Sequence, residues 1–219
     1  MRTTWKTELP QLTLIAAMFV LAAASWSSAP DQIPVHWGLS GQPDRYGGKF
    51  EGLLLLPLVA LGIYLLLLLL PRIDPRRANY ARFRGAYLAI RAAILVFLAL
   101  IYGFILLWIE GIKLEVSTVV PILVGGLFMV MGFFMGRIQP NWFVGIRTPW
   151  TLSSELSWRK THRLGGWVFA LTGLIFVASG LAGSTTAFMV ALTFLVAGVL
   201  LLVVYSYLVW RVDPQRSSR

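Results

Sequence analysis

The chain contains no cysteine among its 219 residues. Disulfide bonds, thiolate metal sites and thiol nucleophiles are therefore excluded. Charged residues are also scarce, at 13% of the chain, and only nine residues are acidic. Because a soluble domain usually carries about 25% charged residues, this scarcity points away from a soluble protein. The sequence is instead 58% hydrophobic, which is typical of an integral membrane protein.

Histidine is nearly as scarce, and the chain has only His36 and His162. Neither belongs to an HExxH motif and no Cys/His pair is available, so the usual transition-metal signatures are missing. Each histidine would need carboxylates to hold a divalent ion, Asp31 and Asp44 for His36 and Glu155 for His162. We therefore predict no metal and no cofactor.

The motifs of several functional classes are absent as well. No nucleophile elbow accompanies the serines, which disfavours a serine hydrolase, and we assign no catalytic residue. No groove-reading motif accompanies the net charge of +10, so we predict no nucleic-acid partner. Arg91, Glu110 and Arg137 all lie near the ends of apolar runs, with Arg91 close enough to one surface to extend to it. Coupled ion transport is therefore disfavoured.

What the sequence does have is six apolar runs, each long enough to cross a hydrocarbon core as a helix of about 20 residues. They lie near residues 10–28, 52–70, 86–109, 118–137, 164–182 and 186–210. With both termini in the cytoplasm, every one of the 19 Lys and Arg residues except Arg45, Lys49 and Lys113 falls on the cytoplasmic side. The positive-inside rule thus predicts an all-α integral membrane protein with six transmembrane helices and cytoplasmic N- and C-termini. Residues 22–24 resemble a signal-peptide cleavage region, but we expect this first run to stay as a span because the charges then balance better.

Two loops are too rich in polar and aromatic residues to be simple connectors. The outer loop, residues 30–51, combines proline-directed extended backbone with glycine turns, and we expect an ordered extracytoplasmic loop. The inner loop, residues 138–163, separates the fourth and fifth spans. In it, Thr148 should cap a helix that begins at Pro149 and carries one stripe of Thr151, Glu155, Trp158 and His162. We predict that this amphipathic cytoplasmic segment lies at the membrane surface with its tryptophan rings at headgroup level.

These features divide the chain into an N-terminal two-helix unit, residues 1–85, and a four-helix region, residues 86–219. Glycines spaced by seven recur in the fourth run, at Gly125 and Gly132, and in the fifth, at Gly166, Gly173 and Gly180. This spacing keeps glycine on one helix face, where small residues let two backbones approach closely. We predict that the two helices pack on each other or on a neighbour, which would fix the inner loop between them.

Two segments, IPVHWGLSGQPDRYGGK and NWFVGIRTPWTLSSELSWRKTHRLGG, together resemble the SdpI family of bacterial membrane proteins. The first resembles the small N-terminal domain of unknown function that often precedes the SdpI region, and the second resembles the signature of that region. The resemblance implies a non-enzymatic cell-membrane protein of toxin-immunity or signal-transduction type. The best-known member protects a producing cell from a secreted toxic peptide and holds a transcriptional repressor at the membrane.

Besides the lipid bilayer, we therefore expect an extracytoplasmic peptide toxin at the outer loop and a cytosolic regulator protein at the inner loop. The outer candidates are His36, Trp37, Asp44, Arg45 and Lys49, and the inner candidates are Asn141, Arg147, Thr148, Trp150, Glu155, Trp158 and His162. The helix start after Thr148, with Arg147 beside it, also suits an anion such as a lipid headgroup or a partner's carboxylate. Two alternatives stay open, a membrane enzyme or lipid-handling protein acting at the bilayer surface and a small-substrate permease. The sequence does not define the oligomeric state.

Overall fold

The computed structural model describes residues 4–216. Its α-helices are α1 (Trp5–Ser25), α2 (Leu55–Ile73), α3 (Arg84–Ile109), α4 (Val116–Met135), α5 (Pro149–Ser153), α6 (Glu155–Ala182) and α7 (Thr185–Arg211). A π-helical turn, η1 (Phe50–Leu54), leads into α2, and a 3-10 helix, η2 (Arg77–Ala81), precedes α3. Strands β1 (Ile33–Trp37) and β2 (Pro43–Gly47) pair as an antiparallel hairpin. Six of the helices are long and apolar enough to cross a membrane, which confirms the predicted six-helix membrane fold.

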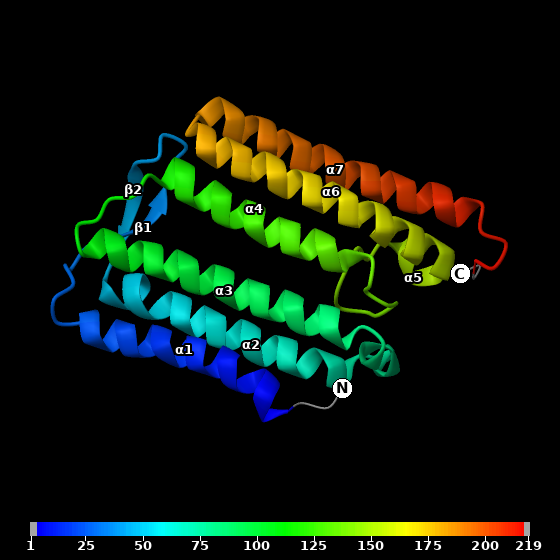
Figure 1. Cartoon of the computed structure of the whole chain (residues 1–219), viewed down its shortest axis with the longest axis horizontal. Coiled ribbons are helices and arrows are strands. Elements are labelled where there is room, and N and C mark those ends of the chain that lie inside the picture. The colour runs from blue at the N-terminus through cyan, green and yellow to red at the C-terminus, as the bar shows by residue number, and fades with distance from the viewer. Residues whose placement is uncertain (1–3, 217–219) are drawn as a thin grey trace.

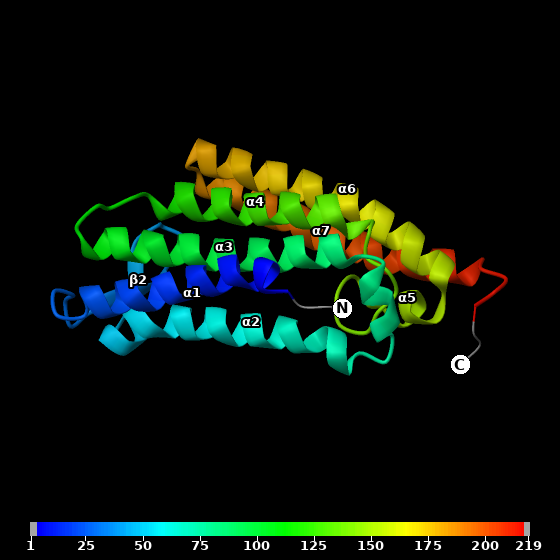
Figure 2. The same ribbon diagram turned by 60° about the horizontal axis from the view of Figure 1, so that its bottom comes forward.

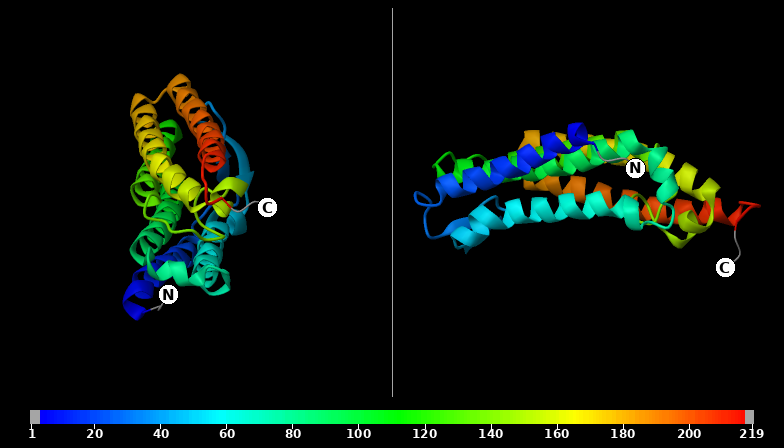
Figure 3. Two further views of the ribbon diagram at one scale, coloured as in Figure 1. Left: turned by 90° about the vertical axis from the view of Figure 1, so that its right-hand side faces the viewer. Right: turned by 90° about the horizontal axis from the view of Figure 1, so that it is seen from below.

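The six long helices run side by side in an elongated bundle (Figure 1). Helices α1, α2 and α3 form one half and α4, α6 and α7 form the other, with α3 and α4 adjacent where the halves meet (Figures 1 and 2). The β-hairpin lies at one end, which we call the hairpin end; α5 and η2 lie at the other, which we call the basic end. Figure 3 shows the same separation from below. Helix α1 starts on the side of the basic end, and α7 ends at the basic end (Figure 1). This arrangement requires an even number of spans between them.

The hairpin adds a small sheet to the predicted all-α fold, and it orders the outer loop as expected. Ile33 is fully buried against Gly52, where an added Cβ would lie 2.6 Å from Ile33 Cγ2. Trp37 packs edge-on against Phe104 and Trp108 of α3, with ring centroids 5.5 and 6.2 Å apart. The hairpin is therefore fixed to the helices below it by apolar contacts.

The predicted glycine packing joins α4 to α6 at the level of the backbone. A Cβ at Gly173 would lie 2.6 Å from the carbonyl oxygen of Gly125, and a Cβ at Gly132 would lie 2.7 Å from that of Gly166. At the hairpin end, a Cβ at Gly180 would meet the carbonyl oxygen of Thr118 at 2.6 Å. No other residue fits at such separations, so the spacing of seven does mark a helix interface.

Arg91 does not extend to the membrane surface as predicted. Its side chain has no exposed surface, and its Nη2 donates to Glu8 Oε2 of α1 at 2.6 Å. Tyr64 of α2 donates to the same oxygen at 3.0 Å, and the guanidinium lies 5.5 Å from the Tyr64 ring centroid. An ion pair buried between three helices therefore replaces the expected contact with water.

The predicted amphipathic helix is not one helix, and it does not lie along the membrane surface as a unit. The backbone is extended at Ser154, which ends α5 and accepts from the backbone N–H of Ser157 to cap α6. Helix α6 then continues without a break into the fifth span. Trp158 is 1% exposed, so its ring lies in the protein core and not at headgroup level. Serine is a good N-cap, and Glu155 in the first turn favours the new helix start.

Candidate functional site

At the basic end, the loop between α4 and α5 is organised by three buried polar side chains, Asn141, Asp74 and His162. The Asn141 amide nitrogen donates to the carbonyls of Gln139 and Val144 at 2.9 and 2.8 Å, and its carbonyl oxygen accepts from the backbone of Phe143 and Val144. An asparagine side chain can bond to the N–H and carbonyl groups of nearby turn residues, which have no partner in a helix or strand. The loop is thus closed on itself around one fully buried amide.

Asp74, just after α2, ties this loop to the first half of the bundle. Its Oδ2 accepts from the backbone N–H of Trp142 at 2.9 Å and from the Tyr80 hydroxyl at 3.0 Å, and its Oδ1 accepts from the backbone N–H of Arg76 at 2.7 Å. Burial and the neighbouring Asp74 raise the pKa of Tyr80 above its usual range, so the hydroxyl stays protonated as a donor. Asn79 adds a bond of 2.7 Å to the carbonyl of Pro140.

His162 holds the other side of the loop. Its Nδ1 lies 2.8 Å from the carbonyl oxygen of Trp158 and its Nε2 accepts from the backbone N–H of Ile146 at 3.0 Å, which assigns the proton to Nδ1 and leaves the ring neutral. The ring stacks on Trp158 at 4.1 Å, and Trp158 Nε1 donates to the carbonyl of Ile138 at 2.8 Å. Gly145 passes so close, with φ at +115°, that an added Cβ would collide with His162.

Helix α5 is anchored to α7 by hydroxyl groups. Thr148 caps α5 as predicted, accepting from the backbone N–H of Thr151 at 3.2 Å, and its hydroxyl lies 2.9 Å from that of Ser206. Ser157 donates to the carbonyl of Ser206 at 2.8 Å, and Ser154 donates to Asp213. That bond and a second from the backbone N–H of Gln215 hold the pKa of Asp213 below its usual range, so this carboxyl is charged and already engaged.

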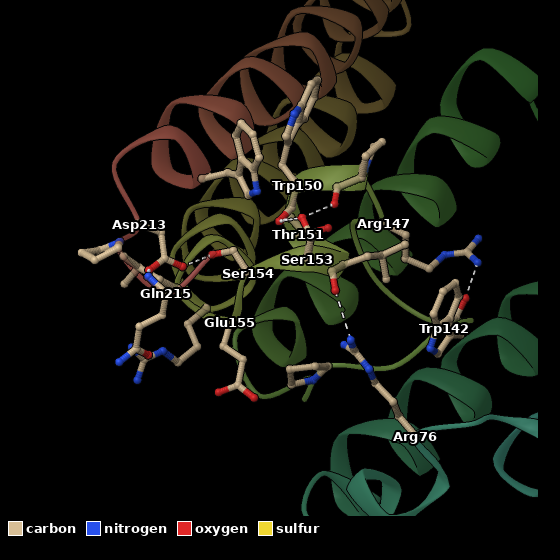
Figure 4. Close-up of a pocket in the computed structure, with 17 residues that line it drawn as sticks. Arg76, Trp142, Arg147, Trp150, Thr151, Ser153, Ser154, Glu155, Asp213 and Gln215 are labelled. Atoms are coloured by element: carbon tan, nitrogen blue, oxygen red, sulfur yellow. Dashed lines mark hydrogen bonds between the residues drawn. The ribbon is translucent and has the colours of Figure 1, made fainter. Parts of the chain in front are cut away.

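These contacts build the walls of a pocket of about 1310 Å³, which we call the α5 pocket (Figure 4). Its charged lining residues are Arg76, Arg147, Arg159, Glu155 and Asp213, and its tryptophans are Trp142, Trp150 and Trp210. Figure 4 places Arg76 and Arg147 on one side of it and Asp213 and Gln215 on the other. The pocket combines donors, cations and flat apolar rings, which suits recognition of an anionic and partly apolar ligand.

The structure divides the seven inner candidates into two groups. Arg147, Trp150 and Glu155 line the α5 pocket with side chains that are at least partly exposed. Asn141, Thr148, Trp158 and His162 are buried, at 0, 9, 1 and 1% exposure, and hold the loop and helix in place. Their buried positions keep them away from a ligand in the pocket and make them part of the structure that shapes it.

Four of the five outer candidates lie on the hairpin, and Lys49 follows it directly before η1. His36 Nδ1 lies 2.5 Å from Asp44 Oδ1 across the two strands, and both side chains are at least half exposed. Arg45 pairs with Glu51 at 2.6 Å, while Lys49 donates to the carbonyl of Trp26 at 3.2 Å. Trp37 faces the helices, so of the five candidates His36, Asp44 and Arg45 contribute to the exposed surface of the hairpin, together with Leu39 and Tyr46.

Outer and inner candidates lie at opposite ends of the bundle, as the hairpin and α5 do in Figure 1, and do not form one site. Within residues 4–216, no group of three His, Cys, Asp or Glu side chains is arranged to hold a metal ion. Sequence reasoning missed Asp74, Ser206 and Asp213, which position the inner loop and α5. For Asp74 a signal existed, because a lone acid between Arg72 and Arg76 in a basic link calls for an explanation.

Comparison with known proteins adds four findings. Residues 137–209 match the SdpI/YfhL protein family, and residues 13–61 match a domain of unknown function, DUF1648. The chain is 24% identical over 170 residues to the immunity protein SdpI of Bacillus subtilis strain 168, an alignment that covers 78% of this chain and 79% of that protein. No solved structure matches the chain significantly. The SdpI/YfhL match includes the inner loop, α5, α6 and most of α7, and the DUF1648 match includes the hairpin.

Proposed function

Because the chain is a multi-pass membrane protein of the SdpI family, with a DUF1648 region ahead of its SdpI/YfhL region, we propose that it is an immunity protein that also transmits a signal. The hairpin binds an extracytoplasmic peptide toxin, and the α5 pocket binds a cytosolic protein. In this proposal the two-helix unit, residues 1–85, supplies the receptor surface and residues 86–219 supply the response.

One observation supports the proposal above all: the polar surfaces able to bind a partner lie at opposite ends of one continuous set of helices. The hairpin turn contacts the starts of α4 and α7, since Thr185 at the start of α7 donates to the carbonyl of Leu39 at 3.3 Å, and Gly41 lies beside Ser117 of α4. Helices α4, α6 and α7 then run from the hairpin end to the α5 pocket. A ligand that displaces the hairpin would therefore act on these helix starts.

The coupling would travel through the α4 and α6 interface. Its backbones are in contact at three glycine levels, so the two helices move together and not independently. Beyond the last of these levels, α6 carries Trp158 and His162, which hold the inner loop. A small rotation of α6 would thus change the position of Ile146 and of the pocket wall formed by Arg147.

The test is protection of cells. The chain is expressed in Bacillus subtilis lacking its own SdpI, and survival is measured in the presence of the toxin that SdpI confers immunity to. We expect protection from the wild-type chain and loss of protection in His36→Ala and Asp44→Ala. This pair is an exposed one, worth less than about 1 kcal/mol, so neither change should unfold the protein.

Glu110→Gln is the matched control, because Glu110 is an exposed acid that follows α3 at the same end and lies outside the hairpin. Membrane levels of all variants are compared by immunoblotting. Full protection by both hairpin variants, at normal membrane levels, would reject the role proposed for the hairpin.

A further inference from the structure

The depth of the α5 pocket relative to the bilayer can be read from α6. Exposed cations at Arg159, Lys160 and Arg163 and at Arg137 after α4 place the edge of the hydrocarbon near Arg163, because Gly136 at the end of α4 packs against Arg163 at that level. From there back to Glu155, α6 extends for roughly 12 Å. A headgroup layer is only about 5–7 Å thick on each side. The part of the pocket near Glu155 therefore opens in water beyond the headgroups, while Arg159, one turn closer to the bilayer, lies at headgroup level.

Among the charged groups that line the pocket and are not already engaged, the cations Arg76, Arg147 and Arg159 outnumber the single acid. Asp213 is 6% exposed and already accepts from Ser154 and Gln215, which leaves Glu155 as the exposed acid among the lining residues. Arg76 uses Nη2 for the carbonyl of Leu152 at 3.1 Å, and Arg147 uses Nη1 for that of Trp142 at 2.6 Å. Each guanidinium has five N–H donors, so both keep several for a ligand.

Flat apolar surfaces complete the pocket. Trp150 packs edge-on against Tyr207 at 5.2 Å, and Tyr207 stacks with Trp210 at 6.1 Å, which forms one aromatic wall. Trp142, 38% exposed, lies beside Arg147 on the other side (Figure 4). At about 1310 Å³ the space exceeds the range of roughly 300–1,000 Å³ that small molecules usually fill. A chain segment with both charged and apolar side chains matches it better than a small anion.

We propose that the α5 pocket binds an acidic peptide segment of a soluble protein, with carboxylates on Arg76 and Arg147 and apolar side chains against Trp150 and Trp210. This inference rests on the proposed function and names the chemistry of its cytosolic partner. An anionic lipid headgroup would offer similar charge, but the depth of the pocket favours a partner that arrives from water.

The test uses the full chain in nanodiscs of phosphatidylcholine and a short fluorescent peptide that alternates glutamate with leucine. A second peptide carries glutamine in place of glutamate. We expect the acidic peptide to bind, with affinity falling as salt rises, and the glutamine peptide to fail. Arg147→Gln and Arg76→Gln should each weaken binding about tenfold or more, the loss expected for a charge-assisted hydrogen bond.

Arg77→Gln is the matched control, because Arg77 is exposed at the same end and lies outside the pocket. Arg147→Lys should bind more tightly than Arg147→Gln, which separates lost charge from a distorted loop. Equal weakening by Arg77→Gln would overturn the proposal in favour of a general electrostatic attraction, and equal binding of both peptides would overturn it because the carboxylates would then contribute nothing. Displacement of the peptide when phosphatidylglycerol is added to the nanodiscs would overturn it in favour of a lipid site.

The survival assay separates this inference from the function on which it rests. If Arg147→Gln lost peptide binding and the cells stayed protected, the pocket's ligand chemistry would stand while protection would not need it. If the hairpin variants also protected fully, the proposed function would fail and the binding result would remain a property of the isolated pocket.

Discussion

Replacing Glu8 alone should destabilise the bundle far more than replacing both partners of the Glu8–Arg91 pair. Arg91 is fully buried, and its Nε and Nη1 have no hydrogen-bond partner among the described residues, so Glu8 supplies its acceptor. In Glu8→Gln the guanidinium stays charged and has lost that carboxylate. Removing one partner of a buried ion pair costs about 3–5 kcal/mol, and because Arg91 lies near one end of its span we expect a loss at the lower limit, near 3 kcal/mol.

Arg91→Met should cost less, about 1–2 kcal/mol, because the charge left behind has other partners. Glu8 is 12% exposed and still accepts from Tyr64 and from Thr7 at 3.0 and 2.9 Å. The double variant removes both charges, so its loss should be no larger than that of Arg91→Met. The two single losses then exceed the double loss by about 3 kcal/mol, which is the coupling energy of the pair.

The free energy of unfolding can be measured by titrating the purified protein with SDS in mixed micelles. Arg45–Glu51 serves as the control pair, because it is as short, at 2.6 Å, but its side chains are 58 and 30% exposed. We expect a coupling of less than about 1 kcal/mol there. A coupling for Glu8 and Arg91 below about 0.5 kcal/mol would mean that the guanidinium reaches water, and the description of a buried pair would be wrong.

Four further predictions concern the other contacts. Gly173→Ala should lower the free energy of unfolding by about 1–3 kcal/mol or more, because its Cβ meets α4 backbone, while Gly126→Ala, with open space around it, should not lower it; thermal unfolding compares them. His162→Ala should cost about 1–3 kcal/mol by removing the acceptor of the Ile146 N–H, whereas exposed Arg163→Ala should change the melting temperature little. The Ser154 bond holds the pKa of Asp213 below the ordinary value of 3.8, so this contact persists above that value and is lost as the pH falls through the lowered pKa. Pepsin should therefore cut the chain after α7 faster only in that acid range, and Ser154→Ala should raise the pH at which cutting begins. In this cysteine-free chain, an impermeant maleimide should label Tyr46→Cys on intact cells and Lys160→Cys only after lysis. Labelling of both on intact cells would refute the predicted orientation, in which the hairpin lies outside and the inner loop in the cytoplasm.

The sequence was informative wherever membrane physics leaves one solution. A long apolar run in lipid must satisfy its own backbone, so it forms a helix, and the six spans follow from that requirement. The glycine interface could be predicted for a related reason, because a spacing of seven puts glycine on one face of any helix. In both cases the information is local to a run of residues.

Contacts between distant residues could not be predicted in this way. Glu8 and Arg91 are 83 residues apart in the sequence, and each lies near the end of its own apolar run. No local pattern therefore pairs them. The same holds for Asp74 and the backbone of Trp142. The break at Ser154 is different, because serine followed by glutamate is a local helix-start signal that the stripe through Glu155 obscured.

The residues that carry the family resemblance at the basic end therefore serve two purposes that can be measured separately. Asn141, Trp158 and His162 are buried and hydrogen-bonded within the protein, so changing them should alter the free energy of unfolding and, through the loop, every property of the pocket. Arg147 is exposed and donates to a single carbonyl at the surface, so its loss should leave unfolding nearly unchanged and act on binding alone. If Arg147→Gln unfolded as readily as His162→Ala, Arg147 would be part of the scaffold, and the pocket would have lost the cation on which its proposed ligand depends.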